Sequence, residues 1–182
     1  VGFTLSFVIR LFLSIVQMGG EIIDTQMGMT MAQIYDASTQ SNLTVTGSLL
    51  NILLILDFFA ENGHYTLLRV LVTSGEVLPY GTASFGQSVA SLVAELFLTC
   101  MVLAVKLALP ILAAELLGEI GMGILMKAIP QINAFVINME LKVIIGLGLF
   151  FLFLTPINEF LLSAEVQMLS SLGQVLETIG GG

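Results

Sequence analysis

The chain has 182 residues, of which 57% are hydrophobic and 10% charged, and its mean hydropathy is +1.03. A soluble domain has about 45–50% apolar and about 25% charged residues, so this composition predicts an integral membrane protein or a subunit of a very apolar complex. The net charge of −8, with five basic residues, argues against nucleic acid as a partner.

The first apolar run covers residues 1–23 and is interrupted by Arg10 and by residues 17–20. A run of about 20 apolar residues is long enough to span a bilayer. The chain opens at Val1 directly into apolar sequence, without an initiator methionine or the features of a signal peptide. We therefore expect it to be a fragment truncated at its N-terminus.

A methionine-rich segment, residues 26–36, follows, and a polar, turn-prone stretch extends it to residue 42. Irregular backbone exposed to lipid lacks hydrogen-bond partners, so this segment must lie inside an assembly or line a water-filled passage. Methionine is unbranched and polarizable, which suits an adaptable seal around unfolded polypeptide. Alternatively, Met27, Met29 and Met31 fill a core around a kink at Gly28. Their alternate spacing favours a non-helical conformation.

A second apolar run over residues 43–60 and a third, weaker helix over residues 65–78 come next. They are joined by Asn62-Gly63-His64, which predicts a tight turn because Asn-Gly readily adopts positive φ. The short connection predicts that the two helices are antiparallel neighbours.

The second half of the chain also has helical patterns, with no alternating strand pattern. Its long helix carries Pro110, and Pro130 and Pro156 each close a segment. The sequence therefore predicts an all-α membrane protein of six or seven hydrophobic helices joined by short loops. The predicted segments in this half are 87–114, 115–129, 133–155 and 157–179.

Charged residues fall inside or beside the apolar runs, where a charge at the bilayer centre costs at least about 2.5–3.5 kcal/mol. We therefore expect helices that contact other helices. Glu95 and Lys106 lie on nearly the same helix face about 16 Å apart, so they cannot pair with each other. They either pair with partner subunits or form a polar stripe along a channel. The charges expected to face partners are Asp57, Glu95, Lys106 and Lys142.

The titratable residues form no catalytic or metal-binding pattern. His64 is the only histidine and Cys100 the only cysteine, so neither a zinc set nor a nucleophile triad exists. We expect Cys100 to be a small buried hydrophobe. The sequence predicts no enzyme activity and no cofactor. One alternative is a small proton-coupled transporter that uses Asp57, Glu95 and Glu115, and an intramembrane enzyme is a more distant one.

Several short motifs follow one another along nearly the whole chain. They are Gly19-Gly20-Glu21, Gln26-Met27-Gly28, Tyr35-Asp36, Asn62-Gly63-His64, Leu78-Pro79-Tyr80-Gly81, Leu109-Pro110, residues 130–137 and Leu141-Lys142. Each motif is weak alone, but as an ordered set they resemble the FliR/SctT family of type III protein export gates, and its flagellar branch most closely. The chain departs from the family at Ala37, where many members have proline, and at Asp24-Thr25, which is more polar than usual.

The resemblance implies a single-copy subunit that joins FliP and FliQ in a helical, closed-pore assembly. It further implies FlhB and FlhA as partners, contact with membrane lipid, and unfolded flagellar proteins as substrates. The location would be the bacterial inner membrane at the flagellar basal body. The main alternative within this family is an injectisome homologue with the same mechanism.

The resemblance also implies which segments carry the function. The loop after the first helix would plug the pore interior, and residues 1–80 would form a plug-bearing, FliP-like part. Residues 84–182 would form a FliQ-like helical hairpin, bent at Pro130, Gln131 and Asn133. The implied plug and gasket residues are Gln26, Met27, Gly28, Met29, Thr30, Met31, Gln33, Tyr35 and Asp36.

Overall fold

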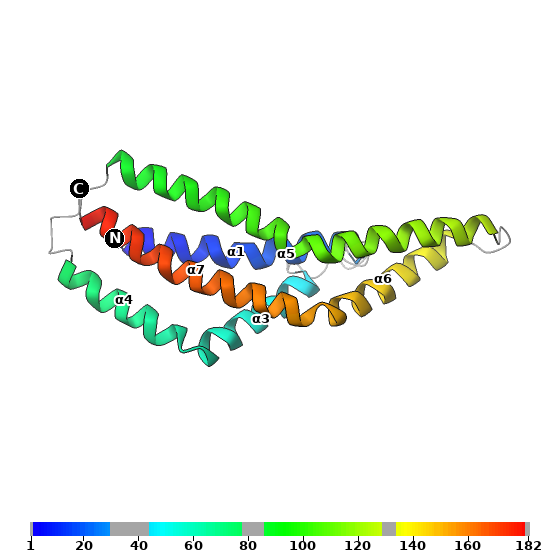
Figure 1. The fold of residues 1–182 in the computed structure, drawn as a ribbon, viewed down its shortest axis with the longest axis horizontal. Coiled ribbons are helices and arrows are strands. Elements are labelled where there is room, and N and C mark those ends of the chain that lie inside the picture. Colours follow the sequence, from blue (N-terminus) through cyan, green and yellow to red (C-terminus); the bar gives the residue numbers. More distant parts are fainter. Residues whose placement is uncertain (1, 30–43, 78–85, 129–133, 181–182) are drawn as a thin grey trace, which may run out of the picture.

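The computed structural model describes residues 2–29, 44–77, 86–128 and 134–180, and all six elements in these ranges are helices (Figure 1). Helices α1 and α5 are each long and apolar enough to cross a membrane, and the bent pairs α3–α4 and α6–α7 raise the number of spans to four if each is one span. The predicted all-α membrane fold is confirmed. The helices are α1 Gly2–Gln26, α3 Val45–Ala60, α4 Gly63–Val77, α5 Gln87–Ala128, α6 Ala134–Leu152 and α7 Leu154–Gly180.

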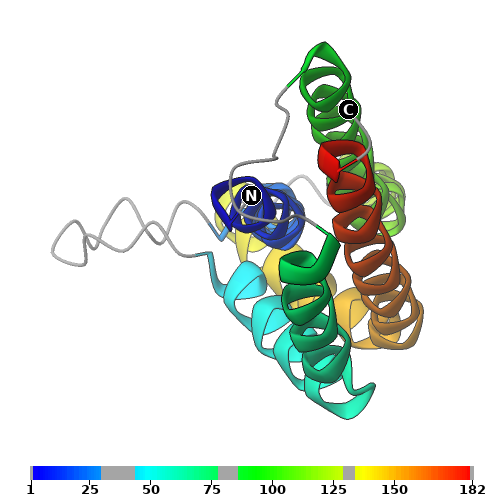
Figure 2. The ribbon, with the colours of Figure 1, turned by 90° about the vertical axis from the view of Figure 1, so that its left-hand side faces the viewer.

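Helix α1 lies within the bundle, where it packs against α3, α5 and α7 (Figure 2). One cluster of buried side chains joins the first half of α1 to α5 and to the second half of α7, and it includes Cys100, which is buried as predicted. A second cluster joins the end of α1 to α3, α5, α6 and α7. Both clusters therefore contain residues from 1–80 and from 84–182, and the proposed division into two parts stays a prediction.

Helices α3 and α4 are not the antiparallel pair that their short connection predicted. Only Glu61 and Asn62 separate them, and the two helices are bent by 72°. Asn62 has a φ of 59°, so the predicted positive φ is present at this turn. This single left-handed residue redirects the chain into α4 at Gly63 without reversing it.

Pro110 and Pro156 lie inside helices, although we expected Pro156 to close one, and Pro130 lies outside the described residues. Helix α5 runs without a break through Pro110, and its ribbon changes direction midway (Figure 1). At 1.5 Å per residue its 42 residues extend about 63 Å, about twice the hydrocarbon thickness of a bilayer. Helix α6 ends at Leu152, and Pro156 is the third residue of α7. Proline is tolerated there because the first N–H groups of a helix have no intrahelical partner.

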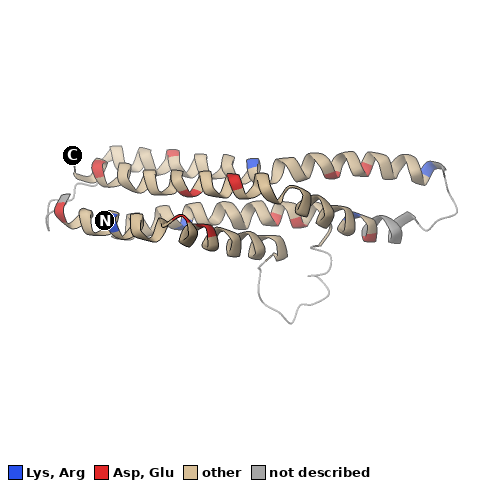
Figure 3. Cartoon of the chain, turned by 60° about the horizontal axis from the view of Figure 1, so that its bottom comes forward, with Lys and Arg blue, Asp and Glu red and all other residues tan. Residues whose placement is uncertain are grey.

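Acidic residues are spread along the helices, and Lys and Arg are much rarer (Figure 3). Within the described ranges one ion pair forms, between Lys142 of α6 and Glu119 of α5. Most of the acidic side chains in these helices therefore have no cationic partner in the described part of the same chain.

Candidate functional site

The end of α1 is fixed by a glycine within the segment that we expected to form the plug. Gly28 has a φ of 77°, which residues with a side chain rarely adopt. The Met29 N–H donates to the Asp24 carbonyl at 2.9 Å, and the Gly28 N–H donates to the Thr25 carbonyl at 3.1 Å. These two bonds form a Schellman motif, which satisfies the last carbonyls of the helix. Residues 27–29 are thus non-helical, as the alternate methionine spacing favoured, whereas Met31 lies outside the described residues.

The beginning of α3 is capped from two sides. Thr44 is the N-cap residue, and its hydroxyl oxygen accepts a hydrogen bond from the Gly47 N–H at 3.1 Å. The Thr46 N–H donates to the two carboxylate oxygens of Asp24, at 3.3 and 3.1 Å, and the Thr46 hydroxyl donates to the same carboxylate. Asp24 has no exposed surface. Its negative charge lies at the N-terminus of α3, where the helix dipole favours it.

This contact ties together the two ends of the segment that we expected to be the plug. Asp24 and Thr46 are 22 residues apart in the sequence and are both buried. The two ends of the segment between them are therefore held at one point of the bundle. We name the pair of residues Asp24 and Thr46 the loop base.

Met27 is a core residue beside the loop base. It has no exposed surface and lies in the second buried cluster, against which Met29 also packs. Gly146 of α6 lies against it: a Cβ added at Gly146 would be 2.5 Å from Met27 Cγ and 2.6 Å from Glu115 Oε1. Glycine at this position therefore leaves room for both side chains. Met27 fits the alternative in which the methionines fill a core.

The remaining residues of the expected plug lie mostly outside the described ranges. Gln26 is the last residue of α1 and is half-buried. The role of these residues as a plug stays a prediction. Outside the described residues are Thr30, Met31, Gln33, Tyr35 and Asp36, as are the expected turn residues Pro130, Gln131 and Asn133.

Three of the expected turn residues are described. Asn62 is exposed, Gly63 is buried, and His64 is half-buried. The His64 ring lies beside those of Phe59 and Tyr65, with ring centroids 5.3 and 4.3 Å away. The histidine thus packs among aromatic rings at the start of α4.

The four charges expected to face partners differ in their surroundings. Glu95 and Lys106 are exposed along α5, and Asp57 is half-buried near the end of α3. Lys142 pairs with Glu119 of the same chain, and its contact with a partner subunit stays a prediction. The α5–α6 hairpin brings these two residues together, although they are 23 positions apart.

The geometry of the described residues does not support the transporter hypothesis or the enzyme hypothesis. Of the three carboxylates in the transporter hypothesis, Glu115 is buried, Asp57 half-buried and Glu95 exposed. None of the three lines the apolar cavity between α1, α3, α4 and α7. Within the described ranges no group of three His, Cys, Asp or Glu side chains has an arrangement that could hold a metal ion.

Sequence reasoning missed Asp24, Thr46 and Gly146. A local signal exists for the α3 N-terminus, because Thr44 precedes an apolar run as an N-cap residue does. No local signal exists for the partner of Asp24, since the contact bridges 22 residues. Gly146 has no signal either, because its role depends on Met27, which directly follows α1 and is far away in the sequence.

Comparison with known proteins identifies the family. A sequence profile of the family described as "Bacterial export proteins, family 1" matches residues 1–167. The chain belongs to this family. The match covers the whole second buried cluster and the α1 and α5 residues of the first, and it includes the loop base, Met27 and Gly146.

Members of the flagellar and the virulence branches are among the relatives. The chain is 27% identical to the flagellar biosynthetic protein FliR of Bacillus subtilis over 146 residues, which is 79% of this chain and 56% of that protein. It is 28% identical to the secretion system apparatus protein SsaT of Salmonella typhimurium, covering 79% of this chain and 56% of that protein. It is 30% identical to the Yop proteins translocation protein T of Yersinia pestis, with 78% and 55% covered. The chain thus spans about half the length of the curated relatives it matches.

Proposed function

We propose that this chain is a structural subunit of the type III protein export gate that serves flagellum assembly, and that residues 26–42 seal its closed pore. Family membership and the likeness to proteins named FliR support the export role. The observation that carries the seal is the buried tie between Asp24 and Thr46. It holds both ends of the segment at one point of the bundle, as a loop that projects into a pore requires.

The proposed partners are FliP and FliQ in a hetero-oligomer, with FlhB and FlhA as further components of the export apparatus. The substrates are unfolded flagellar proteins, and the location is the bacterial inner membrane at the flagellar basal body. Large apolar side chains are exposed on all six described helices, including Phe3, Ile52, Val72, Ile124, Phe151 and Val166. Such surfaces need lipid or neighbouring subunits to cover them.

In the proposed mechanism the loop base and the loop have different tasks. Met27 and the loop base are buried and stay in place, whereas residues 29–36 form the adaptable contact that closes the pore. Opening displaces these residues without disturbing the base. The mechanism forms no covalent bond and needs no cofactor.

The test separates the seal from the fold. We expect Met31→Ala, with Met27 and Met29 unchanged because both contact the second buried cluster, to leave the assembly intact and to increase its ion conductance. The control is Met18→Ala, because Met18 is an exposed methionine of α1 away from the segment. Conductance of the purified assembly in planar bilayers is the measurement. An assembled Met31→Ala variant that conducts no more than the control contradicts the seal.

A second candidate is the injectisome branch, which the likeness to SsaT and to the Yop translocation protein favours. A gene that encodes this chain can be placed in a flagellated bacterium whose own FliR has been deleted and which is therefore non-motile. Restored motility supports the flagellar branch, and restored effector secretion in the matching virulence strain supports the other. Proton-coupled transport by the chain alone in liposomes would instead favour the transporter hypothesis.

A further inference from the structure

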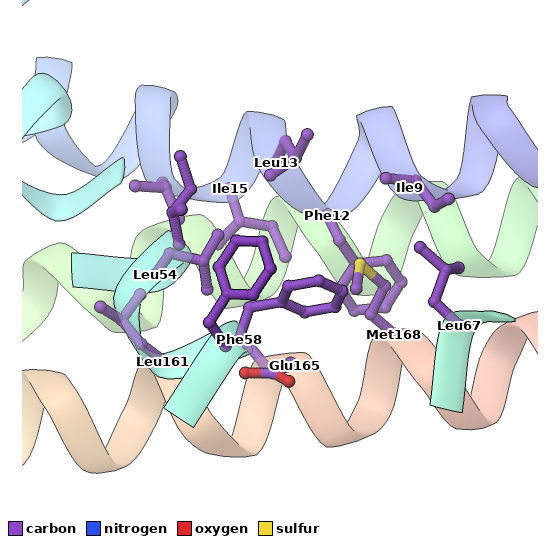
Figure 4. Close-up of a pocket in the computed structure, with 14 residues that line it drawn as sticks. Ile9, Phe12, Leu13, Ile15, Leu54, Phe58, Leu67, Leu161, Glu165 and Met168 are labelled. Carbon is purple, nitrogen blue, oxygen red and sulfur yellow. The ribbon is translucent and has the colours of Figure 1, made fainter. Parts of the chain in front are cut away.

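A cavity of about 300 Å³ lies between α1, α3, α4 and α7 (Figure 4). Neither residue of the loop base lines it. Its walls are apolar and include Phe12, Phe58 and Met168, while Glu165 of α7 is the one ionisable residue among them. Ile55 and Phe59 also line it and are 47% and 59% exposed. The cavity therefore opens along the outer surface of α3.

Glu165 is buried without a complete set of partners. It is only 5% exposed, and its Oε2 atom has no hydrogen-bond donor among the described residues. Its Oε1 atom lies against Gly63, at the place where any other residue would have its Cβ. Two further carboxylates, Asp57 and Glu61, add negative charge near it at the end of α3.

No cation of the described part of the chain compensates this charge. The one ion pair there joins Lys142 to Glu119, and neither residue lines the cavity. A buried charged group that lacks a partner is costly, and charges within membrane segments normally pair with other groups. The surroundings of Glu165 are therefore incomplete in the single chain.

We propose that the cavity receives a Lys or Arg side chain from a membrane helix of a partner subunit, and that the charged end of this side chain pairs with Glu165. Lys and Arg combine an apolar stem with a cationic end, which matches apolar walls around one carboxylate. Exposed Ile52, Ile55 and Phe59 form an apolar face of α3 beside the opening, against which such a helix can pack. This inference rests on the proposed function, because it requires partner subunits.

The experiment uses the complete export assembly with a photo-crosslinking amino acid in place of Ile55 at the cavity opening. We expect a crosslink to one partner subunit, at a peptide that carries a Lys or Arg within about one helical turn. Glu165→Gln keeps the shape but removes the charge, and it should lower the crosslink yield by about tenfold or more, since removing one member of a buried ion pair is strongly destabilising. Glu177→Gln is the matched control, because Glu177 is exposed on the same helix.

The reciprocal change provides a second readout. Glu165→Lys should prevent the crosslink, and replacing the identified Lys or Arg of the partner with Glu should restore it. The free energy of unfolding of the purified chain alone shows whether a variant perturbs the fold. Glu165→Gln should not lower this free energy.

The inference is overturned if the crosslink reaches only lipid or a peptide without Lys or Arg, or if Glu165→Gln leaves the yield unchanged. In these cases the chain still co-purifies with FliP- and FliQ-like subunits, and the proposed function stands. If the chain does not associate with such subunits at all, the proposed function and the inference both fail.

Discussion

Two buried carboxylates of this chain have opposite surroundings. Asp24 lies at the N-terminus of α3 and accepts hydrogen bonds from the backbone and the hydroxyl of Thr46. Glu165 lies beside an apolar cavity, and its Oε2 atom has no donor among the described residues. Asp24 thus has hydrogen-bond donors within the chain, whereas Oε2 of Glu165 has none among the described residues.

The difference suggests that Asp24 serves the folding of this chain and that Glu165 serves its assembly with partner subunits. A satisfied buried carboxylate fixes the position of the elements that it joins, so the ends of the loop are set before any partner arrives. An unsatisfied one weakens the isolated chain, and its retention is explained if a partner supplies the missing group. The α1–α3 side is therefore expected to be rigid, and the α3–α4–α7 side is expected to be completed on assembly.

The largest effect is expected at the loop base. Asp24→Ala removes the acceptor of the Thr46 N–H and hydroxyl, which are buried, and should lower the free energy of unfolding by about 3 kcal/mol. Unfolding of the purified chain by graded addition of SDS to mild micelles measures this. Thr25→Val is the control, because Thr25 is exposed and donates only to the Glu21 carbonyl of its own helix. Equal stability of the two variants would show that the loop base does not hold α1 and α3 together.

The second-largest effect is expected at Gly146, and it tests the packing of Met27 against this glycine. Gly146→Ala places a Cβ against Met27 and Glu115, and overpacking of this kind costs about 1–3 kcal/mol. Gly148→Ala is the matched control on the same helix, where no atom lies within 4 Å of the added Cβ. The same SDS titration should show a loss for the first variant and no loss for the second. A loss of equal size in both would reflect the helix itself and not the contact with Met27.

The third prediction is an increase in the free energy of unfolding, whereas the first two are decreases. Glu165→Leu replaces a buried carboxylate that lacks a donor with an apolar side chain, so it should raise the free energy of unfolding of the isolated chain by about 1–3 kcal/mol. The same variant should reduce recovery of the chain with its partner subunits. Destabilisation of the isolated chain by Glu165→Leu would remove the contrast with Asp24.

The smallest effect is expected at the ion pair between Lys142 and Glu119. Their side chains are 23% and 38% exposed, so Glu119→Gln should lower the free energy of unfolding by less than about 1 kcal/mol. A loss comparable with that of Asp24→Ala would mean that this pair, and not the loop base, is the main polar contact of the fold.

Much of the fold could be predicted from local patterns. Apolar runs gave α1 and α3 within about three residues of their ends, and Asn62-Gly63 marked the break before α4. The 72° bend between α3 and α4 was not predictable, because the direction of a helix after a turn depends on what it packs against. Pro156 was misinterpreted because proline is compatible with the first turn of a helix as well as with its end.

The site was less predictable than the fold. The methionine segment and Gly28 are visible as a local composition change, but the loop base and the cavity are made of residues far apart in the sequence. Asp24 and Glu165 look alike in the sequence, as acids within apolar helices that also carry other acids. Only the packing of neighbouring helices shows that Asp24 has donors and that Oε2 of Glu165 has none among the described residues.

The most direct test of the central claim is a cryo-electron microscopy map of the complete export assembly that contains this chain. The account predicts density for residues 26–42 inside the central conduit, with Asp24 and Thr46 in contact at its wall. Density for this segment on the outer surface of the particle, exposed to solvent or lipid, would contradict it.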